Sequence, residues 1–235
     1  MYKKISNIAD REFIEKELGV KYKFPRLYTP SSVIDGSQEA TLSIITMDNP
    51  DHISYAIWGI LPKNYEGEWS DFQKALDTLS VPKENLNSNG IFQEPYHKRR
   101  CLIIVTGFFI YHLYNGTLYP YYVYLDSKKP FYIAGVYNTL DDGFITCSMV
   151  MTKTTGIIDK IQNLSTSMPI FVSDNLSDIW LNPKTDMDEI DYILNLPNTL
   201  EFKAHPIAKE FFKNDISYES MLEPVYYKGI PLARK

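Results

Sequence analysis

Cysteine is scarce in this chain, with two residues among 235. Both lie in apolar segments, Cys101 in CLIIV and Cys147 in ITCSMVM, which favours buried free thiols over a disulfide framework. No apolar run approaches the roughly 18 residues that a membrane span needs. The first residues are polar and charged, unlike a signal peptide. We therefore expect a cytoplasmic protein that does not enter the membrane.

Patterns that build metal and phosphate sites are also missing. There is no Gly-rich phosphate loop and no Gly-x-Ser-x-Gly nucleophile turn. The four histidines are not spaced like metal ligands; they are His52, His97, His112 and His205. We expect neither a metal nor another cofactor.

Positive charge is in deficit, because the formal net charge is −5. A dedicated nucleic-acid binder usually carries a basic surface, so this chain can offer only a local one. The densest basic cluster is Lys98-Arg99-Arg100. It fits a solvated loop ahead of a strand, or a set of phosphate contacts.

Tyrosine is in excess: 18 Tyr and 12 Phe contribute to an aromatic content of 14%. Flat side chains suit the pleated surface of strands, so a strand-rich core explains the excess. A surface on which unpaired bases stack is the alternative explanation.

The first hundred residues predict alternating helices and strands. Residues 9–18 have helical spacing and end at Gly19. Residues 41–47 and 53–61 predict strands joined by a turn at 48–51. Residues 69–80 predict a helix with Phe72, Leu76 and Leu79 on one face, and residues 81–100 are polar and irregular.

The centre of the chain predicts consecutive strands. A hairpin signal, Asn115-Gly116, separates two aromatic runs, and further strands follow in FYIAGVYNTL and FITCSMVM. Short helices are expected over 152–160, 174–182 and 186–195, with Asp174 and Asp186 as N-caps. Without an internal repeat or a long linker, residues 1–235 predict a single α+β domain.

Five blocks in this order carry a family resemblance: IWGILP at 57–62, LNSN at 86–89, RRCL followed by GFFIY at 99–111, PYY followed by FYIAGVY at 120–137, and MPI through Trp180-Leu181. Together they resemble the SOS response-associated peptidase (SRAP) family, also called abasic-site processing proteins. The resemblance covers nearly the whole chain. It implies a β-rich, barrel-like core with peripheral helices and a role in the response to DNA damage.

The family works through a cysteine at the N-terminus once the initiator Met is removed. Its amine attacks the ring-opened aldehyde of an abasic site, and its thiol closes the adduct into a thiazolidine. That position is Tyr2 here, whose phenol ordinarily has a pKa of ~10 and cannot form the ring. The family's glutamate falls on Ile110, and its histidine falls on Gln162 or Ser165.

Two family arginines that hold phosphates are also replaced, by Asn89 and Ser167, whereas Asn87, Trp58, Met168 and Pro169 are retained. We therefore expect a catalytically inactive family member, with no confident catalytic residue. It would bind single-stranded or abasic DNA weakly, as a monomer. The residues expected at that interface are Trp58, Asn87, Asn89, Lys98, Arg99, Arg100, Ser167 and Met168.

Two alternatives stay open. An active enzyme with rearranged groups would use Lys3, Lys4 or the Met1 amine to form a Schiff base, with His112 as a possible relocated base. The acidic balance instead favours a protein-interaction module that has an unidentified protein partner and no nucleic-acid role.

Overall fold

A ring of five strands forms the centre of the computed structural model, which describes residues 2–88, 90–212 and 219–230. Neighbouring strands pair in the order β11-β10-β7-β4-β5, and β5 pairs back onto β11 through Ile57↔Thr146 and Trp58↔Cys147. The ring confirms the predicted α+β class with a β-rich core. Its strands are β4 (Thr41–Thr46), β5 (Asn49–Trp58), β7 (Arg100–Val105), β10 (Phe131–Thr139) and β11 (Ile145–Lys153).

Four short strands attach to this ring. β6 pairs with β11 in parallel, β12 pairs with β11, β13 with β10, and β2 with β5. Their bounds are β2 (Lys21–Tyr22), β6 (Ser80–Pro82), β12 (Ser167–Pro169) and β13 (Phe171–Val172).

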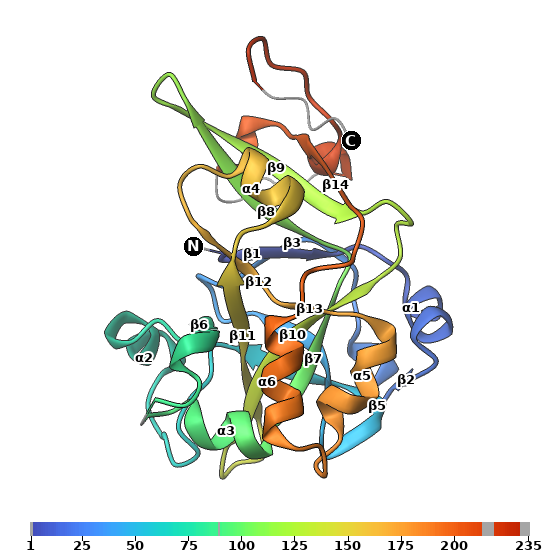
Figure 1. Ribbon diagram of the computed structural model, residues 1–235, viewed down its shortest axis with the longest axis vertical. Helices are drawn as coiled ribbons and strands as arrows, with labels where there is room; N and C mark the ends of the chain where they lie inside the picture. The colour runs from blue at the N-terminus through green and yellow to red at the C-terminus, as the bar shows by residue number, and fades with distance from the viewer. Residues whose placement is uncertain (1, 89, 213–218, 231–235) are drawn as a thin grey trace.

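A second sheet lies above the ring in Figure 1 and has the order β14-β9-β8-β1-β3. Its inner side chains, such as Ile5, Phe108 and Ile110, share one apolar core with ring residues such as Ile103 and Met149. Short 3-10 helices cover its outer face. The elements are β1 (Lys4–Asn7), β3 (Ser31–Asp35), β8 (Gly107–Tyr114), β9 (Thr117–Leu125), β14 (Phe202–Pro206), η3 (Lys209–Phe212) and η4 (Glu219–Leu222).

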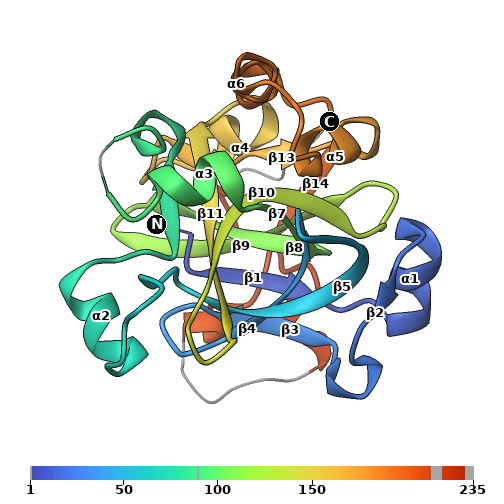
Figure 2. The ribbon, with the colours of Figure 1, turned by 90° about the horizontal axis from the view of Figure 1, so that it is seen from below.

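Helices cover the outside of the ring, where a second apolar cluster includes Ile14, Tyr96, Trp180 and Ile190. Figure 2 shows α1 at one edge and α5 and α6 on one side. None of the helices among the described residues is long and apolar enough to span a membrane. They are α1 (Arg11–Leu18), α2 (Trp69–Ala75), α3 (Gln93–Lys98), α4 (Gly156–Ile161), α5 (Asp174–Leu181) and α6 (Met187–Asn195), with 3-10 turns η1 (Pro25–Leu27) and η2 (Lys83–Asn85).

Several predicted elements are confirmed. Gly19 ends α1 with φ 70°, a left-handed conformation that glycine adopts without strain. Asn115 and Gly116 have φ of 48° and 71°, as a two-residue hairpin turn between β8 and β9 requires. Asp186 caps α6 by accepting a hydrogen bond from the Asp188 amide.

Other predictions were wrong. The helix expected over 69–80 stops at Ala75, because Thr78 bonds to Gln73 and to the Ile60 carbonyl and the chain then pairs with β11 as β6. The irregular stretch 81–100 contains α3. β5 already begins at Asn49, inside the expected turn, and the N-cap of α5 is Ser173 instead of Asp174.

Arg100 is buried at the join between the ring and its helices, with 1% of its surface exposed. Its guanidinium donates to the carbonyl oxygens of Trp180 at 2.8 Å, Asn182 at 3.1 Å, and Tyr96 and His97 at 3.2 Å each. These carbonyls belong to the C-terminal ends of α3 and α5, where helix dipoles favour a cation. The charge is thus neutralised by dipoles, without a carboxylate among these contacts.

We predict that Arg100→Met lowers the free energy of unfolding by about 3–5 kcal/mol, because four buried carbonyls lose their donor. The neighbouring Arg99→Met is the matched control. Arg99 is half-buried, pairs with the exposed Glu94 and donates to Asn138 Oδ1, so its loss should cost less, roughly 1–2 kcal/mol. Urea denaturation of both variants measures the difference, and equal losses would contradict the role assigned to Arg100.

Candidate functional site

Tyr2 lies where the start of the chain, strand β8 and the loop after α4 meet. Its ring centroid is 5.9 Å from that of Phe108, and 3% of its surface is exposed. A cavity of about 70 Å³ beside it is lined by Tyr2, Phe109, Tyr111, Gln162, Leu164 and Ser165. The structure therefore brings Tyr2 together with both candidates for the family's histidine position, Gln162 and Ser165.

Ile110, at the family's glutamate position, lies on β8 between Phe109 and Tyr111 and points into the core that Tyr2 also joins. It is fully buried and pairs with Tyr121 across the β8–β9 hairpin. An aliphatic side chain in this place can neither accept nor donate a proton.

The loop between α4 and β12 is fixed by its own side chains. The Gln162 carboxamide donates to the Ser165 carbonyl at 2.8 Å and to the Ser167 carbonyl at 2.9 Å. Asn163 exchanges two hydrogen bonds with the Leu113 backbone, at 2.8 and 2.9 Å. Gln162 thus uses both amide hydrogens to hold the loop.

His112 also contributes to this attachment. Its Nδ1 lies 2.6 Å from the Ile161 carbonyl oxygen, so this nitrogen carries the hydrogen and donates it. The contact ties β8 to the C-terminal end of α4. It gives His112 a structural partner, whereas its use as a relocated base stays a prediction.

The Tyr2 hydroxyl oxygen is buried and has no hydrogen-bond partner among the described residues. Burial raises the pKa of Tyr2 well above its ordinary value, with a further rise from Tyr111 and a partial opposing effect from the nearby Gln162 side chain. The phenol therefore stays neutral and is not a nucleophile at physiological pH.

The two cysteines do not replace the missing thiol. Cys101 and Cys147 are both free and fully buried inside the ring, as predicted. Burial raises the pKa of each thiol, and for Cys101 the neighbouring Cys147 raises it further. Neither sulfur is exposed to a substrate or present as a thiolate.

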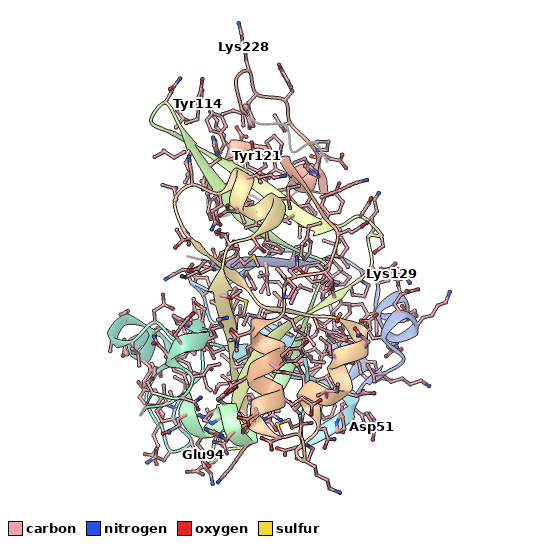
Figure 3. All side chains as sticks on the ribbon, viewed as in Figure 1. Asp51, Glu94, Tyr114, Tyr121, Lys129 and Lys228 are labelled. Atoms are coloured by element: carbon pink, nitrogen blue, oxygen red, sulfur yellow. The ribbon has the colours of Figure 1, made fainter. Side chains whose placement is uncertain are left out.

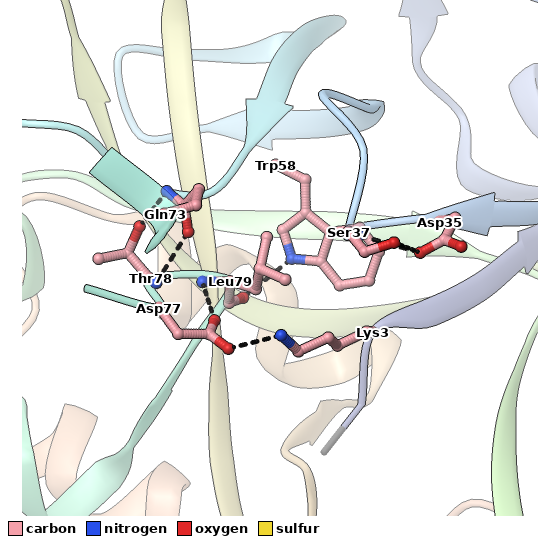
Figure 4. A network of polar contacts seen from close by, with 8 residues as sticks. All are labelled: Lys3, Asp35, Ser37, Trp58, Gln73, Asp77, Thr78 and Leu79. Carbon is pink, nitrogen blue, oxygen red and sulfur yellow. Dashed lines mark hydrogen bonds and ion pairs between the residues drawn. The ribbon is translucent and has the colours of Figure 1, made fainter. Parts of the chain in front are cut away.

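The two lysines near the start of the chain are engaged in ion pairs. Lys3 Nζ lies 2.9 Å from Asp77 Oδ2, and Lys4 Nζ lies 2.8 Å from Asp35 Oδ2. Figure 4 shows the Lys3–Asp77 pair beside Trp58. Met1 lies outside the described residues.

Two residues expected at a DNA interface prove to be structural. Trp58 is fully buried, and its indole donates to the Leu79 carbonyl at 2.9 Å (Figure 4). Arg100 is held by the helix ends described above. Neither side chain reaches the surface, so the prediction that they contact nucleic acid is corrected.

The remaining interface residues do not form one surface. Ser167 is half-buried and pairs with Lys153 at one end of β11, next to Met168, which is 3% exposed. Arg99 donates to Asn138 Oδ1 at 3.1 Å, and Asn138 pairs with Thr146 near the other end. Seven residues of strand separate these ends by roughly 23 Å.

In Figure 3, Glu94, the ion-pair partner of Arg99, lies near the lower end of the molecule, far from Tyr121, the strand partner of Ile110. Lys98 is exposed, and its Nζ lies 3.7 Å from Glu94 Oε1. Asn87 is exposed and bonds to His97 at 3.0 Å, and Asn89 lies outside the described residues. A DNA contact by Asn87, Lys98 or Arg99 stays a prediction, but it would lie far from Tyr2.

A larger cavity of about 650 Å³ adjoins Arg99. Its walls mix charges of both signs, Asp48 and Glu94 with Lys63 and Arg99. Among residues 2–88, 90–212 and 219–230, no three histidine, cysteine or acidic side chains are grouped as a metal would require.

The model of the SOS response associated peptidase (SRAP) family matches residues 3–214. The chain belongs to the SRAP family. It is 27% identical over 188 residues to the abasic site processing protein YoqW of Bacillus subtilis, covering 77% of this chain and 80% of YoqW. It is 28% identical over 187 residues to YobE of the same organism, covering 77% and 82%.

Solved structures show the same fold. A Bacteroides thetaiotaomicron protein superposes with a TM-score of 0.84 at 23% identity, covering 95% of this chain and 99% of that one. A Bordetella bronchiseptica protein gives 0.70 at 14% identity, covering 88% and 99%. Tyr2, Gln162 and Ser165 line one cavity within this shared fold.

We predict that Tyr2→Phe raises the free energy of unfolding by about 1 kcal/mol, because the variant no longer buries a hydroxyl without a partner. Tyr137→Phe is the matched control. The Tyr137 hydroxyl donates to Asp48 Oδ2 at 2.5 Å, so its removal should cost about 2 kcal/mol. Opposite signs in thermal or urea unfolding are expected, and a loss of stability in Tyr2→Phe would show that the hydroxyl is satisfied in solution.

Proposed function

We propose that this protein is an SRAP-family member without covalent abasic-site activity that binds single-stranded DNA non-covalently. The observation that carries the proposal is the burial of Tyr2 at the family's reactive position. The cavity left beside it, about 70 Å³, is far below the roughly 300–1,000 Å³ of sites that enclose a small molecule. A ring-opened sugar with its phosphates has no room there.

Replacement of the polar groups around Tyr2 supports the same proposal. Ile110 brings a hydrocarbon where the resemblance places a proton-handling carboxylate, and Gln162 is occupied in holding the loop. Proton transfer beside an attacking amine needs a titratable group within hydrogen-bond reach. Neither residue supplies one.

Rearranged amine chemistry has less support. An amine attacks an aldehyde in its neutral form, and a carboxylate in contact with it favours the protonated ammonium instead. Lys3 contacts Asp77, and Lys4 contacts Asp35 on β3, the edge strand of the second sheet. We therefore propose that neither acts as a Schiff-base former.

The similarity to proteins named for abasic-site processing supports DNA as the ligand class. We propose that the scaffold retains weak affinity for single strands after the loss of chemistry. Such binding rests on phosphate charge and base stacking, so it needs no reactive residue and falls steeply with salt.

Covalent capture tests the loss of chemistry. We predict that incubation with an abasic single-stranded oligonucleotide, with or without borohydride, gives no protein–DNA adduct on a denaturing gel. An SRAP protein that carries the N-terminal cysteine serves as the positive control. An adduct that disappears in Lys3→Ala or Lys4→Ala would establish the rearranged-amine alternative and refute the proposal.

Non-covalent binding is measured separately. Fluorescence anisotropy with a labelled oligothymidylate should show saturable binding at low salt and its loss at high salt. The presence of an abasic site in the oligonucleotide should change the affinity little, since the pocket beside Tyr2 excludes it. Absence of binding at low salt would remove the DNA-binding half of the proposal and favour a protein partner.

A further inference from the structure

The segment Lys21–Tyr28 alternates basic and aromatic residues, in the sequence KYKFPRLY. It runs from β2 through η1 along the edge of the ring, beside α1 and β5 (Figures 1 and 2). Lys21, Lys23 and Arg26 are all exposed. None of the three forms an ion pair with another described residue, so their charges face solvent.

The acidic groups nearby are mostly occupied. Glu12 and Glu15 pair with Arg11, and Glu17 pairs with Lys129 at 2.6 Å. Asp10 and Asp51 remain without an ion pair among the described residues. Lys21, Lys23 and Arg26 therefore outnumber the local unpaired acids, although the chain as a whole has a net charge of −5.

Aromatic rings accompany these cations. Phe24 is 53% exposed, and Lys23 Nζ lies 5.5 Å from its ring centroid. Tyr22 stacks on Tyr55 with centroids 5.7 Å apart and lies 4.8 Å from Tyr28. The Tyr55 hydroxyl donates to the Phe24 carbonyl at 3.0 Å, which ties the backbone at Phe24 to the three tyrosines.

A cavity of about 180 Å³ opens beside this group, between β3 on one side and β4 and β5 on the other. Apolar cavities of about 150 Å³ take up a benzene ring, so this one has the size of a single planar heterocycle. It is lined by Tyr28 and Tyr55 and by Asn7, Leu27, Thr29, Ile34, Thr41 and Ser43.

Asn7 contributes a buried polar side chain to the wall of the cavity. Its side chain is 3% exposed, and its Nδ2 donates to the Ile104 carbonyl at 3.3 Å. Its Oδ1 has no partner among the described residues.

We propose that Lys21–Tyr28 and the adjoining cavity bind single-stranded nucleic acid: Lys21, Lys23 and Arg26 contact phosphates, Phe24 stacks on a base, and the cavity accepts one unpaired base between its tyrosine walls. The inference rests on the proposed non-covalent DNA binding and gives it a surface. That surface lies at the Asn7 end of β1, whereas Tyr2 precedes the other end, roughly 17 Å away along an extended chain.

The test is anisotropy of a labelled oligothymidylate with the full chain over a range of salt concentrations. Single-strand contacts contribute a slope of about −0.7 per phosphate in log K against log salt. The triple variant Lys21→Ala/Lys23→Ala/Arg26→Ala should therefore make the slope shallower by about 2. Lys153→Ala/Lys160→Ala/Lys184→Ala is the control with the same charge change at exposed lysines elsewhere, and it should leave the slope unchanged.

The aromatic contact has a different signature. Phe24→Ala should weaken binding about tenfold without changing the salt slope, because stacking releases no counterions. Phe144→Ala, which removes another exposed phenylalanine, is the matched control. Inorganic polyphosphate, which has no bases, should compete poorly with the oligonucleotide.

The outcomes separate this inference from the proposal beneath it. If the wild-type protein binds but the triple variant behaves like its control, the surface is assigned wrongly and the DNA-binding proposal stands. Effective competition by polyphosphate, with Phe24→Ala unchanged, would overturn the base contacts. If the wild-type protein does not bind DNA, both the proposed surface and the proposed non-covalent DNA binding are overturned. The loss of covalent chemistry is tested independently by covalent capture.

Discussion

The fold depends on a buried cation that is neutralised by backbone carbonyls. Arg100 begins β7, in the middle of the ring, and its guanidinium bonds to the C-terminal ends of α3 and α5. Burial lowers the pKa of Arg100, yet its planar fork matches four carbonyls that would otherwise lose water without a replacement. One side chain thereby fixes two helices to the ring. Lysine, with a single charged nitrogen, could not reach acceptors on both helices.

Around that frame, large apolar and aromatic side chains fill the position that the family uses for chemistry. Tyr2 is large enough to pack on Phe108 and close the pocket, and Ile110 completes the apolar layer. Gln162 takes up a structural task on the loop that faces them. The proposed loss of chemistry is compatible with this packing, because a protein interior tolerates apolar replacements whereas proton transfer needs a titratable group.

The sequence predicted the elements whose signals are local. Gly19, Asn115-Gly116 and Asp186 mark ends and turns through their own backbone chemistry, and each was placed correctly. The end of α2 depended on Thr78 reaching Gln73 and Ile60, a tertiary contact that periodicity does not contain. Trp58 and Arg100 were predicted to contact DNA because tryptophan and arginine are common at binding surfaces. Both residue types also occur in protein cores, and residue type alone does not predict burial. The alternation of basic and aromatic residues in Lys21–Tyr28 is visible in the sequence, but Lys98-Arg99-Arg100 is the denser basic cluster and was favoured for that reason.

Closure of the ring through Ile57 and Thr146 constrains the order of events during synthesis. β4 and β5 emerge from the ribosome early, and β2 already pairs with β5 at His52 and Ile53, but the partner of Ile57 and Trp58 is made only near residue 146. Until then this nascent hairpin presents an unpaired strand edge, the kind of surface that recruits other chains. Chaperone occupancy or slow co-translational aggregation should thus concentrate on intermediates that end before β11, and a chain released there has no means of sealing itself.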